Sequence, residues 1–439
     1  MSTLTSELQF EAPGVRRRDW TIIILIGAIH ASSHFFQLIL PTLYLSLAHE
    51  FGYDFTQLGL LVSLFFLVSC FGQASSGFVV DRIGATPVLL TGLSLFVLSA
   101  VLMGLSEGYP MLMLAALVGG TGNSVFHPAD YAIINHRISL RRLGHAFSVH
   151  GLTGNLGWAL TPVFMAVLIH WFSWRVAAFG AAGLVAVILV CAWLGRDLLS
   201  GRGAAWADAT EAPDTDEAPA KGPAALDLSR QSAWDTLRTL LGQPALWGAF
   251  LFFACTTIAL SAVQNYTIPM LGQVYGIDKV LAGSTLSAYM LAAAAGMAAG
   301  GFLVGATPNT ERTVAISLIL AGLFLLVLAA GAVPSGMAMG LVALAGFSSG
   351  VSAPSRDMLI RRVTPKGATG TVYGLVYSGM DVGSSLAPTA FGFLFDLGYV
   401  QSPWIGAAVA FCAAAGLAVY VAHAASLNAP TAVRVRKAV

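Results

Sequence analysis

Between Arg175 and Arg196 the chain reads VAAFGAAGLVAVILVCAWLG, twenty residues without a charged side chain. Because a helix rises about 1.5 Å per residue, about 20 apolar residues cross the hydrocarbon core of a bilayer. The sequence therefore predicts a membrane-spanning helix over residues 174–196. Eleven similar stretches make twelve expected spans, at residues 20–46, 56–80, 86–106, 109–136, 144–171, 174–196, 244–273, 280–305, 311–332, 334–361, 369–396 and 401–425.

The composition supports the same class of protein. Of the 439 residues, 56% are hydrophobic and only 10% are Asp, Glu, Lys or Arg, whereas a soluble domain carries about 25% charged residues. Such a chain has too little charge to cover a water-facing surface, and it is too long to form one buried core. The net charge of +1 gives no basic field for nucleic acid. We expect an all-α integral membrane protein in contact with the lipid bilayer.

The Lys and Arg residues between the spans predict the orientation. Only Arg175 and Lys279 fall in the expected outer loops. The inner side collects Arg16, Arg17, Arg18, Arg82, Arg137, Arg141, Arg142, Arg312, Arg361, Arg362, Lys366, Arg434, Arg436 and Lys437, and the central linker adds Arg196, Arg202, Lys221, Arg230 and Arg238. We therefore expect a multi-pass protein of the inner (plasma) membrane with both termini in the cytoplasm.

The spans fall into two groups of six around a polar linker. The expected organisation is a cytoplasmic tail over 1–19, a six-helix bundle over 20–196, a linker over 197–243, a second bundle over 244–425 and a basic tail over 426–439. The linker is rich in Ala, Pro and acidic residues and lacks apolar periodicity, which favours flexibility. Its last part, 229–241, can form an amphipathic surface helix.

The two halves repeat each other with an offset of 226 residues. Pro128, Gly144, Gly157 and Pro162 match Pro354, Gly370, Gly383 and Pro388, and Asn155 falls on Asp381. Because six helices separate the copies, the repeat is parallel and its pseudo-two-fold axis runs along the membrane normal. Transporters built in this way hold their solute between the halves near mid-membrane.

Two short stretches, one in a loop and one at the start of a helix, resemble sequence features of a known family. The stretch 77–84, GFVVDRIG, is similar to the inner-loop signature of the major facilitator superfamily, and Trp174-Arg175 with Phe179 is similar to another of its features. This resemblance implies that Asp81 and Arg82 take part in closing the cytoplasmic side, and it implies a monomer by analogy. The matching loop of the second half, around 301–308, has lost both acid and base.

Two further stretches most resemble the fosmidomycin-resistance-like branch of that superfamily. They are HASSHFFQLILP at 30–41 and NSVFHPADY at 123–131. His30, His34 and Gln37 lie at i, i+4 and i+7 and therefore share one face of the first helix, which Pro41 continues. Three interpretations stay open for the two histidines: contact with the solute, hydrogen bonding within the core, and chelation of a transition metal.

Asp381 is the strongest single candidate for a functional charged residue inside the membrane. It is expected near the centre of its span, with Tyr377 one turn earlier, and charge inside a membrane is expensive and usually functional. A buried carboxyl group can carry a proton at physiological pH, so Asp381 is a candidate for proton coupling. A fixed salt bridge to Arg356 is the equally weighted alternative.

Asp130, Arg356 and Asp357 are expected toward the cytoplasmic ends of spans four and ten, where they suit a gate better than a solute site. Pro128 and Pro354 are expected to break these two helices. The predicted solute-binding set is drawn from several spans: His30, His34, Gln37, His127, Asn155, Gln264, Asn265 and Tyr377.

These features predict a proton-coupled secondary transporter that moves a small polar or anionic solute by alternating access, with drug or metabolite efflux as the favoured direction. A proton-coupled uptake symporter for a small organic acid is the alternative. A metal transporter or an intramembrane metal enzyme is less favoured than either of these, because the internal repeat covers the full length of the chain. No ATP-binding GxxxxGK[ST] loop is present. We therefore expect no enzyme activity, no cofactor and no dedicated metal site.

Overall fold

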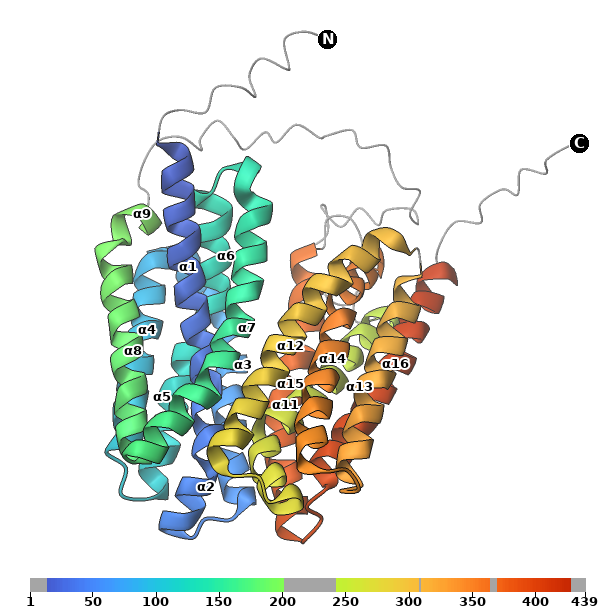
Figure 1. The fold of residues 1–439 in the computed structure, drawn as a ribbon. Coiled ribbons are helices and arrows are strands. Elements are labelled where there is room, and N and C mark those ends of the chain that lie inside the picture. Colours follow the sequence, from blue (N-terminus) through green and yellow to red (C-terminus); the bar gives the residue numbers. More distant parts are fainter. Residues whose placement is uncertain (1–13, 201–241, 308, 364–368, 428–439) are drawn as a thin grey trace, which may run out of the picture.

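The computed structural model describes residues 14–200, 242–307, 309–363 and 369–427, and this part of the chain is helical without a strand (Figure 1). The N-terminal half contains α1 (Val15–Gln37), α2 (Ile39–Phe51), α3 (Phe55–Ile83), α4 (Ala85–Gly104), α5 (Tyr109–Asn123), α6 (Phe126–Arg137), α7 (Leu140–Trp171), α8 (Trp174–Leu194) and α9 (Arg196–Ser200). The C-terminal half contains α11 (Pro244–Tyr275), α12 (Lys279–Ala306), α13 (Thr310–Ala329), α14 (Ser335–Val363), α15 (Thr369–Asp396) and α16 (Ser402–Leu427). The two halves form two helix bundles side by side, as the repeat predicts.

Ten stretches of the described residues are long and apolar enough to cross a membrane. The other two predicted spans are the pair α5–α6, whose members are short, and α15, which has 28 residues but carries the polar run YSGMDVGSS at 377–385. Together these elements account for the twelve predicted spans, and the all-α, two-bundle fold class is confirmed.

Two spans of the N-terminal half are broken in the same way. α1 ends at Gln37 and α5 at Asn123, and the helices that continue them carry Pro41 and Pro128 at their third positions. A proline ring clashes with the carbonyl four residues earlier, so each helix stops there. The break predicted at Pro128 is therefore confirmed. The break predicted at Pro354 is wrong, because α14 runs through that residue.

The halves touch mainly along two pairs of helices, α3 with α15 and α7 with α12, and to a smaller extent between α2 and α11. Glycine allows close approach in the first pair: a Cβ on Gly59 would lie 2.3 Å from the Pro388 carbonyl oxygen, and one on Gly392 would lie 2.2 Å from the Phe55 carbonyl oxygen. The internal repeat relates the second and eleventh spans to the eighth and fifth, so it exchanges one helix pair with the other. The interface therefore follows the predicted pseudo-two-fold axis.

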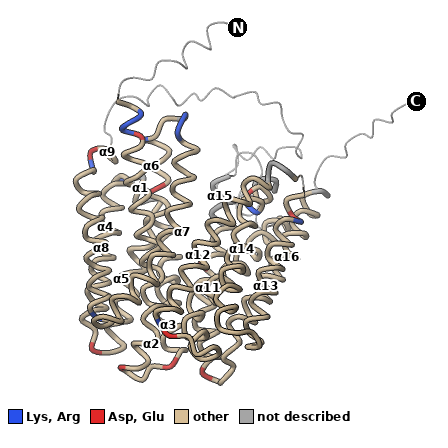
Figure 2. Tube along the Cα trace, in the orientation of Figure 1, with Lys and Arg blue, Asp and Glu red and all other residues tan. Residues whose placement is uncertain are grey.

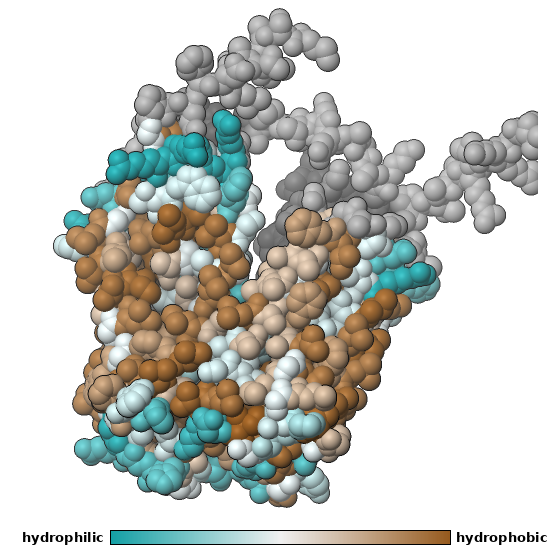
Figure 3. Space-filling view, in the orientation of Figure 1, coloured by the Kyte–Doolittle hydropathy of each residue, from teal (hydrophilic) through white to brown (hydrophobic). Residues whose placement is uncertain are grey.

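The contacts between the halves are concentrated away from the chain termini. The Asp396 carboxylate accepts hydrogen bonds from the backbone N–H of Phe55 at 2.8 Å and of Thr56 at 2.7 Å, and Tyr44 Oη donates to Asn265 Oδ1 at 3.0 Å. Toward the termini the bundles diverge, and a cleft opens between them in the space-filling view (Figure 3). The structure is therefore closed at one end and open at the end where α1 begins and α16 ends.

Charge differs between the two ends of the molecule. In the described part of the chain, Lys and Arg gather mainly at the end where the termini lie (Figure 2). Arg175 starts α8 at the opposite end, where it pairs with Glu50. α1 already begins at Val15, inside the predicted tail 1–19, and the amphipathic helix predicted over 229–241 lies outside the described residues.

Candidate functional site

Asp130 of α6 is one of two fully buried carboxyl groups in the described part of the N-terminal bundle, the other being Asp19. Its Oδ2 atom lies 3.1 Å from Nδ1 of His30 on α1 and 3.2 Å from Nε2 of His150 on α7. The carboxyl group is fully buried, and the two imidazole rings stack with centroids 3.5 Å apart. A buried carboxylate is costly unless it is paired, so the two hydrogen bonds explain how three helices hold it here.

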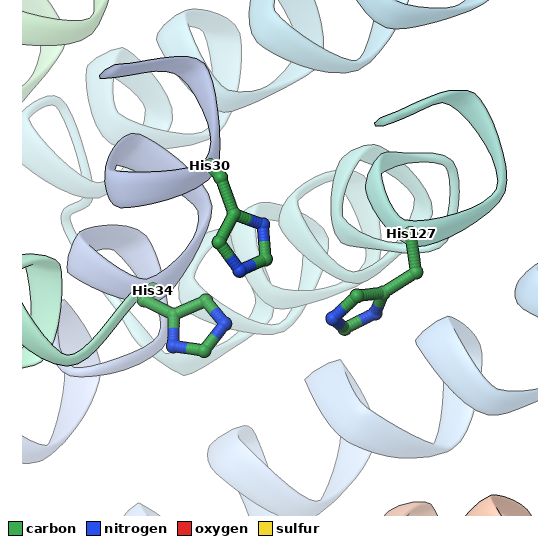
Figure 4. Close-up of side chains that lie close together, drawn as sticks. All are labelled: His30, His34 and His127. Atoms are coloured by element: carbon green, nitrogen blue, oxygen red, sulfur yellow. The ribbon is translucent and has the colours of Figure 1, made fainter. Parts of the chain in front are cut away.

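Two further imidazoles join this group, and we call His30, His34, His127 and His150 the histidine cluster. The ring centroid of His30 lies 4.5 Å from that of His34 and 5.5 Å from that of His127. The side chains of these three point toward one another from α1 and α6 (Figure 4). Both ring nitrogens of His34 are buried without a hydrogen-bond partner within the described structure. The cluster therefore contains unused nitrogen lone pairs or N–H groups.

A chain of hydrogen bonds continues the site where α1 and α5 end. Gln37 Nε2 donates to Asn123 Oδ1 at 3.1 Å, and Asn123 Nδ2 donates to Ser69 Oγ at 2.8 Å. Gln37 Oε1 accepts from Trp158 Nε1 at 3.0 Å, and the Trp158 ring lies 4.2 Å from the His34 ring. The two proline breaks thus lie beside each other and place amide groups next to the histidine cluster.

Asp381 faces the other half of the protein. Its partly buried carboxyl group lies within electrostatic range of the Cys70 thiol on α3. Arg356, which was the candidate partner, instead pairs with its neighbour Asp357 at 2.9 Å. Within the described chain Asp381 forms no ion pair, so the salt-bridge alternative finds no support in this conformation.

The other predicted solute-binding residues are placed differently. Asn155 Nδ2 donates to the Gly151 carbonyl of its own helix at 3.1 Å, and Asn265 is bonded to Tyr44 across the halves. Gln264 is buried and its Nε2 atom has no partner among the described groups. Tyr377 packs against Phe253 with ring centroids 4.7 Å apart. The predicted set therefore divides between the region of the histidine cluster, Asn155 on α7, and separate positions on α11 and α15.

The predicted gate residues also separate. Arg82 is exposed at the end of α3, whereas the side chain of Asp81 lies outside what the structure describes. Asp357 lies within electrostatic range of Tyr131 on the opposite half, near the open end. Asp130 contacts only its own bundle in the hydrogen bonds above, so its geometry favours a role in organising histidines rather than a contact across the cleft.

Sequence reasoning did not select Asn123 or place His150 in the site. Asn123 is the first residue of the stretch NSVFHPADY at 123–131, but it is uncharged and so was not selected. It enters the site because α5 ends there, before the helix break. His150 is twenty residues from Asp130 in the chain and meets it only because α6 and α7 fold back on each other. A polar residue directly before a proline-induced break is the signal that points to Asn123.

Two repeated bundles of membrane-spanning helices, open at one end, form an architecture in which secondary transporters are built. The family comparison agrees with this class: the model described as Major Facilitator Superfamily matches residues 25–388 and 259–437. The chain belongs to the major facilitator superfamily. The curated relatives include a protein named as a transporter, and the solved structure of a transporter homologue shares the fold.

Among curated relatives, the fosmidomycin resistance protein of Escherichia coli (strain K12) is 30% identical over 175 residues, which is 40% of this chain and 43% of that protein. The match thus spans less than half of that relative. The "Probable L-galactonate transporter" of Escherichia coli (strain K12) is 22% identical over 87% of this chain and 84% of that protein. A bacterial homologue of the human lysosomal transporter Spinster, solved in an inward-facing and unoccupied conformation, shares the fold with a TM-score of 0.69 at 15% identity, covering 96% of this chain and 98% of that one.

Proposed function

We propose that this chain is a proton-driven exporter of a small polar or anionic solute across the inner (plasma) membrane, with both termini in the cytoplasm and a single chain as the working unit. The halves rock around the site between them, so that the cleft seen here on the side of the termini closes as the opposite end opens. The likeness to the fosmidomycin resistance protein over part of the chain favours export of a drug or metabolite.

A single observation carries the proton coupling: Asp381 lies on a membrane-spanning helix without an ion-pair partner in the described structure. An unpaired carboxyl group in that place is stabilised by taking up a proton, and it releases the proton when the conformational change exposes it. His34, His127, Gln37 and Tyr377 are the proposed solute contacts, because each is only partly buried within its bundle.

The alternative direction is uptake of a small organic acid by symport. It is favoured by the likeness to the protein named as an L-galactonate transporter, which extends over most of both chains. Arg356 on α14 supplies a cation for a carboxylate solute, since its exposed fraction is 23% and its guanidinium stacks over Phe253 at 5.0 Å.

Growth inhibition separates the two directions. Cells lacking competing transporters would express the wild type, Asp381→Asn or Asp381→Glu and would meet a panel of phosphonates, toxic organic acids and unrelated antibiotics. We expect specific resistance with the wild type, loss of it with Asp381→Asn and recovery with Asp381→Glu, which restores the carboxyl group. Specific sensitisation by the wild type would instead establish uptake, and an Asp381→Asn protein as active as the wild type would remove Asp381 from coupling.

A further inference from the structure

The histidine cluster contains a set of side chains with the composition of a metal site. The ligand atoms of His30, His34 and His127 all lie within 4.8 Å of one another. We propose that these three imidazoles form a binding site for a divalent transition-metal ion of the Zn²⁺ type. The site shares residues with the proposed solute site, but metal binding is measurable in the purified chain whether or not the proposed transport is correct.

The hydrogen bonds of the His30 and His127 rings involve Nδ1 and leave Nε2 of each ring available to a metal ion. His30 Nδ1 lies 3.1 Å from Asp130 Oδ2, and His127 Nδ1 lies 3.2 Å from Gln73 Oε1. An oxygen acceptor beside Nδ1 places the ring proton on that atom, so that Nε2 presents a lone pair. His34 has no hydrogen-bond partner at either nitrogen, although both atoms are buried. A metal ion would satisfy all three rings at once.

The position of Asp130 matches a recurring feature of metal sites. A histidine ligand usually donates its second N–H to a carboxylate or carbonyl, which fixes the ring and makes the ligand more basic. Asp130 accepts a hydrogen bond from His30 in this manner, and its Oδ2 atom also lies 3.2 Å from His150 Nε2. His30, Asp130 and His150 form a second set within ligand range, but their own hydrogen bonds already occupy them. The first set is therefore the stronger site.

Gly154 of α7 forms one wall of the site. A Cβ at this position would lie 3.1 Å from His30 Nε2, 3.1 Å from His34 Nδ1 and 2.9 Å from His34 Cε1. A side chain there would occupy space between two of the ligands. The absence of a side chain at Gly154 thus keeps the nitrogen atoms accessible, and it gives a substitution that blocks the site while leaving every ligand in the chain.

The ligand type selects the class of metal. Imidazole nitrogen suits Zn²⁺, Ni²⁺, Co²⁺ and Cu²⁺, whereas Mg²⁺ and Ca²⁺ prefer oxygen ligands. The ligand atoms lie within 4.8 Å of one another, and small rotations of the side chains can bring them to metal–nitrogen distances of about 2.0–2.1 Å. Three protein ligands leave the fourth position of a tetrahedral ion open to water or to an oxygen atom of the solute.

Zn²⁺ binding to the full, tag-free chain in detergent tests the proposal. Equilibrium dialysis followed by elemental analysis should find one Zn²⁺ per chain, and Co²⁺ should give the visible absorption of a four-coordinate ion. His34→Ala and His127→Ala should abolish stoichiometric binding, and Asp130→Asn should weaken it by about 10–100-fold. His170→Ala is the matched control, because His170 lies on α7 but is exposed and outside the cluster.

Gly154→Ala keeps the proposal testable if a histidine variant fails to fold. A monodisperse elution profile confirms the fold, and Zn²⁺ binding should then be weakened at least 10-fold, because the methyl group contacts two ligands. Wild-type protein that binds no stoichiometric Zn²⁺ would overturn the proposal. Binding that survives in both His34→Ala and His127→Ala would overturn it as well, since the ion would then lie elsewhere.

Discussion

The carboxyl group of Asp130 shows how single residues hold this site. It is buried inside the N-terminal bundle, where it accepts hydrogen bonds from one histidine of α1 and one of α7. Removing it leaves two buried N–H groups without an acceptor. The hydrogen bonding of His30 and His150 therefore depends on this one side chain, although Asp130 was selected from the sequence for a different role.

Asp130→Ala should destabilise the protein by about 1–3 kcal/mol, the typical cost of leaving a buried polar group unpaired. The midpoint of thermal unfolding in detergent measures the effect. Asp357→Ala is the control, because Asp357 is 50% exposed and its ion pair with Arg356 is partly solvated, so its loss should cost about 0–1 kcal/mol. Equal midpoints for the two variants would contradict the role given to Asp130.

At the scale of helices, close packing in the C-terminal half depends on glycine. α12 and α14 approach through Gly296, Gly346 and Gly350, and a Cβ at these positions would lie 2.0–2.3 Å from carbonyl oxygens of the facing helix. Lipid supplies no hydrophobic force between helices, so van der Waals contact between backbones provides the attraction. These two helices therefore require a residue without a side chain at each crossing point.

Gly350→Ala should force α14 away from Ala293 of α12, because its Cβ would otherwise lie 2.0 Å from that carbonyl oxygen. The expected cost is about 1–3 kcal/mol, as for other overpacked cores, and a lower unfolding midpoint reports it. Gly340→Ala lies on the same helix with no atom within 4 Å of the new Cβ, so it should be neutral or stabilising. A similar loss in both variants would exclude the packing explanation.

At the scale of the whole molecule, a side chain of the C-terminal half caps a helix of the N-terminal half at the closed end. Asp396 ends α15 and accepts from two N–H groups at the start of α3. The first N–H groups of a helix lack partners within the helix and attract negative charge. In the proposed alternating-access cycle this contact is lost when that end opens, so we expect it to favour the conformation seen here.

Asp396→Ala should shift the population toward the conformation that is open at the opposite end. A cap of this kind is worth about 0.5–2 kcal/mol, which corresponds to a change of about 2–30-fold in the ratio of the two states. Distances between spin labels placed on the two halves at that end measure the shift. Asp278→Ala is the matched control, since Asp278 caps its own helix α12 through Val280 and Leu281. An equal shift in both variants would refute the interdomain role.

The sequence by itself determined the class of fold and its symmetry. Membrane spans are set by length and hydropathy, because a bilayer of fixed thickness demands a fixed run of apolar residues. The offset repeat likewise predicted two bundles, and the break before Pro128 followed from the geometry of proline. These features are local or periodic, so they can be deduced from one chain without its contacts.

Only the tertiary structure decided which polar residues meet. His30, His34 and His127 were predicted as one solute-binding set, whereas Asp130 was expected at a gate. Asp130 and His150 join the three histidines only through contacts between helices that are far apart in the chain. Pro354 matches Pro128 in sequence, yet its helix stays continuous. Packing between distant helices determines which of these polar side chains meet, because a buried polar group is stable only where the fold brings it a partner.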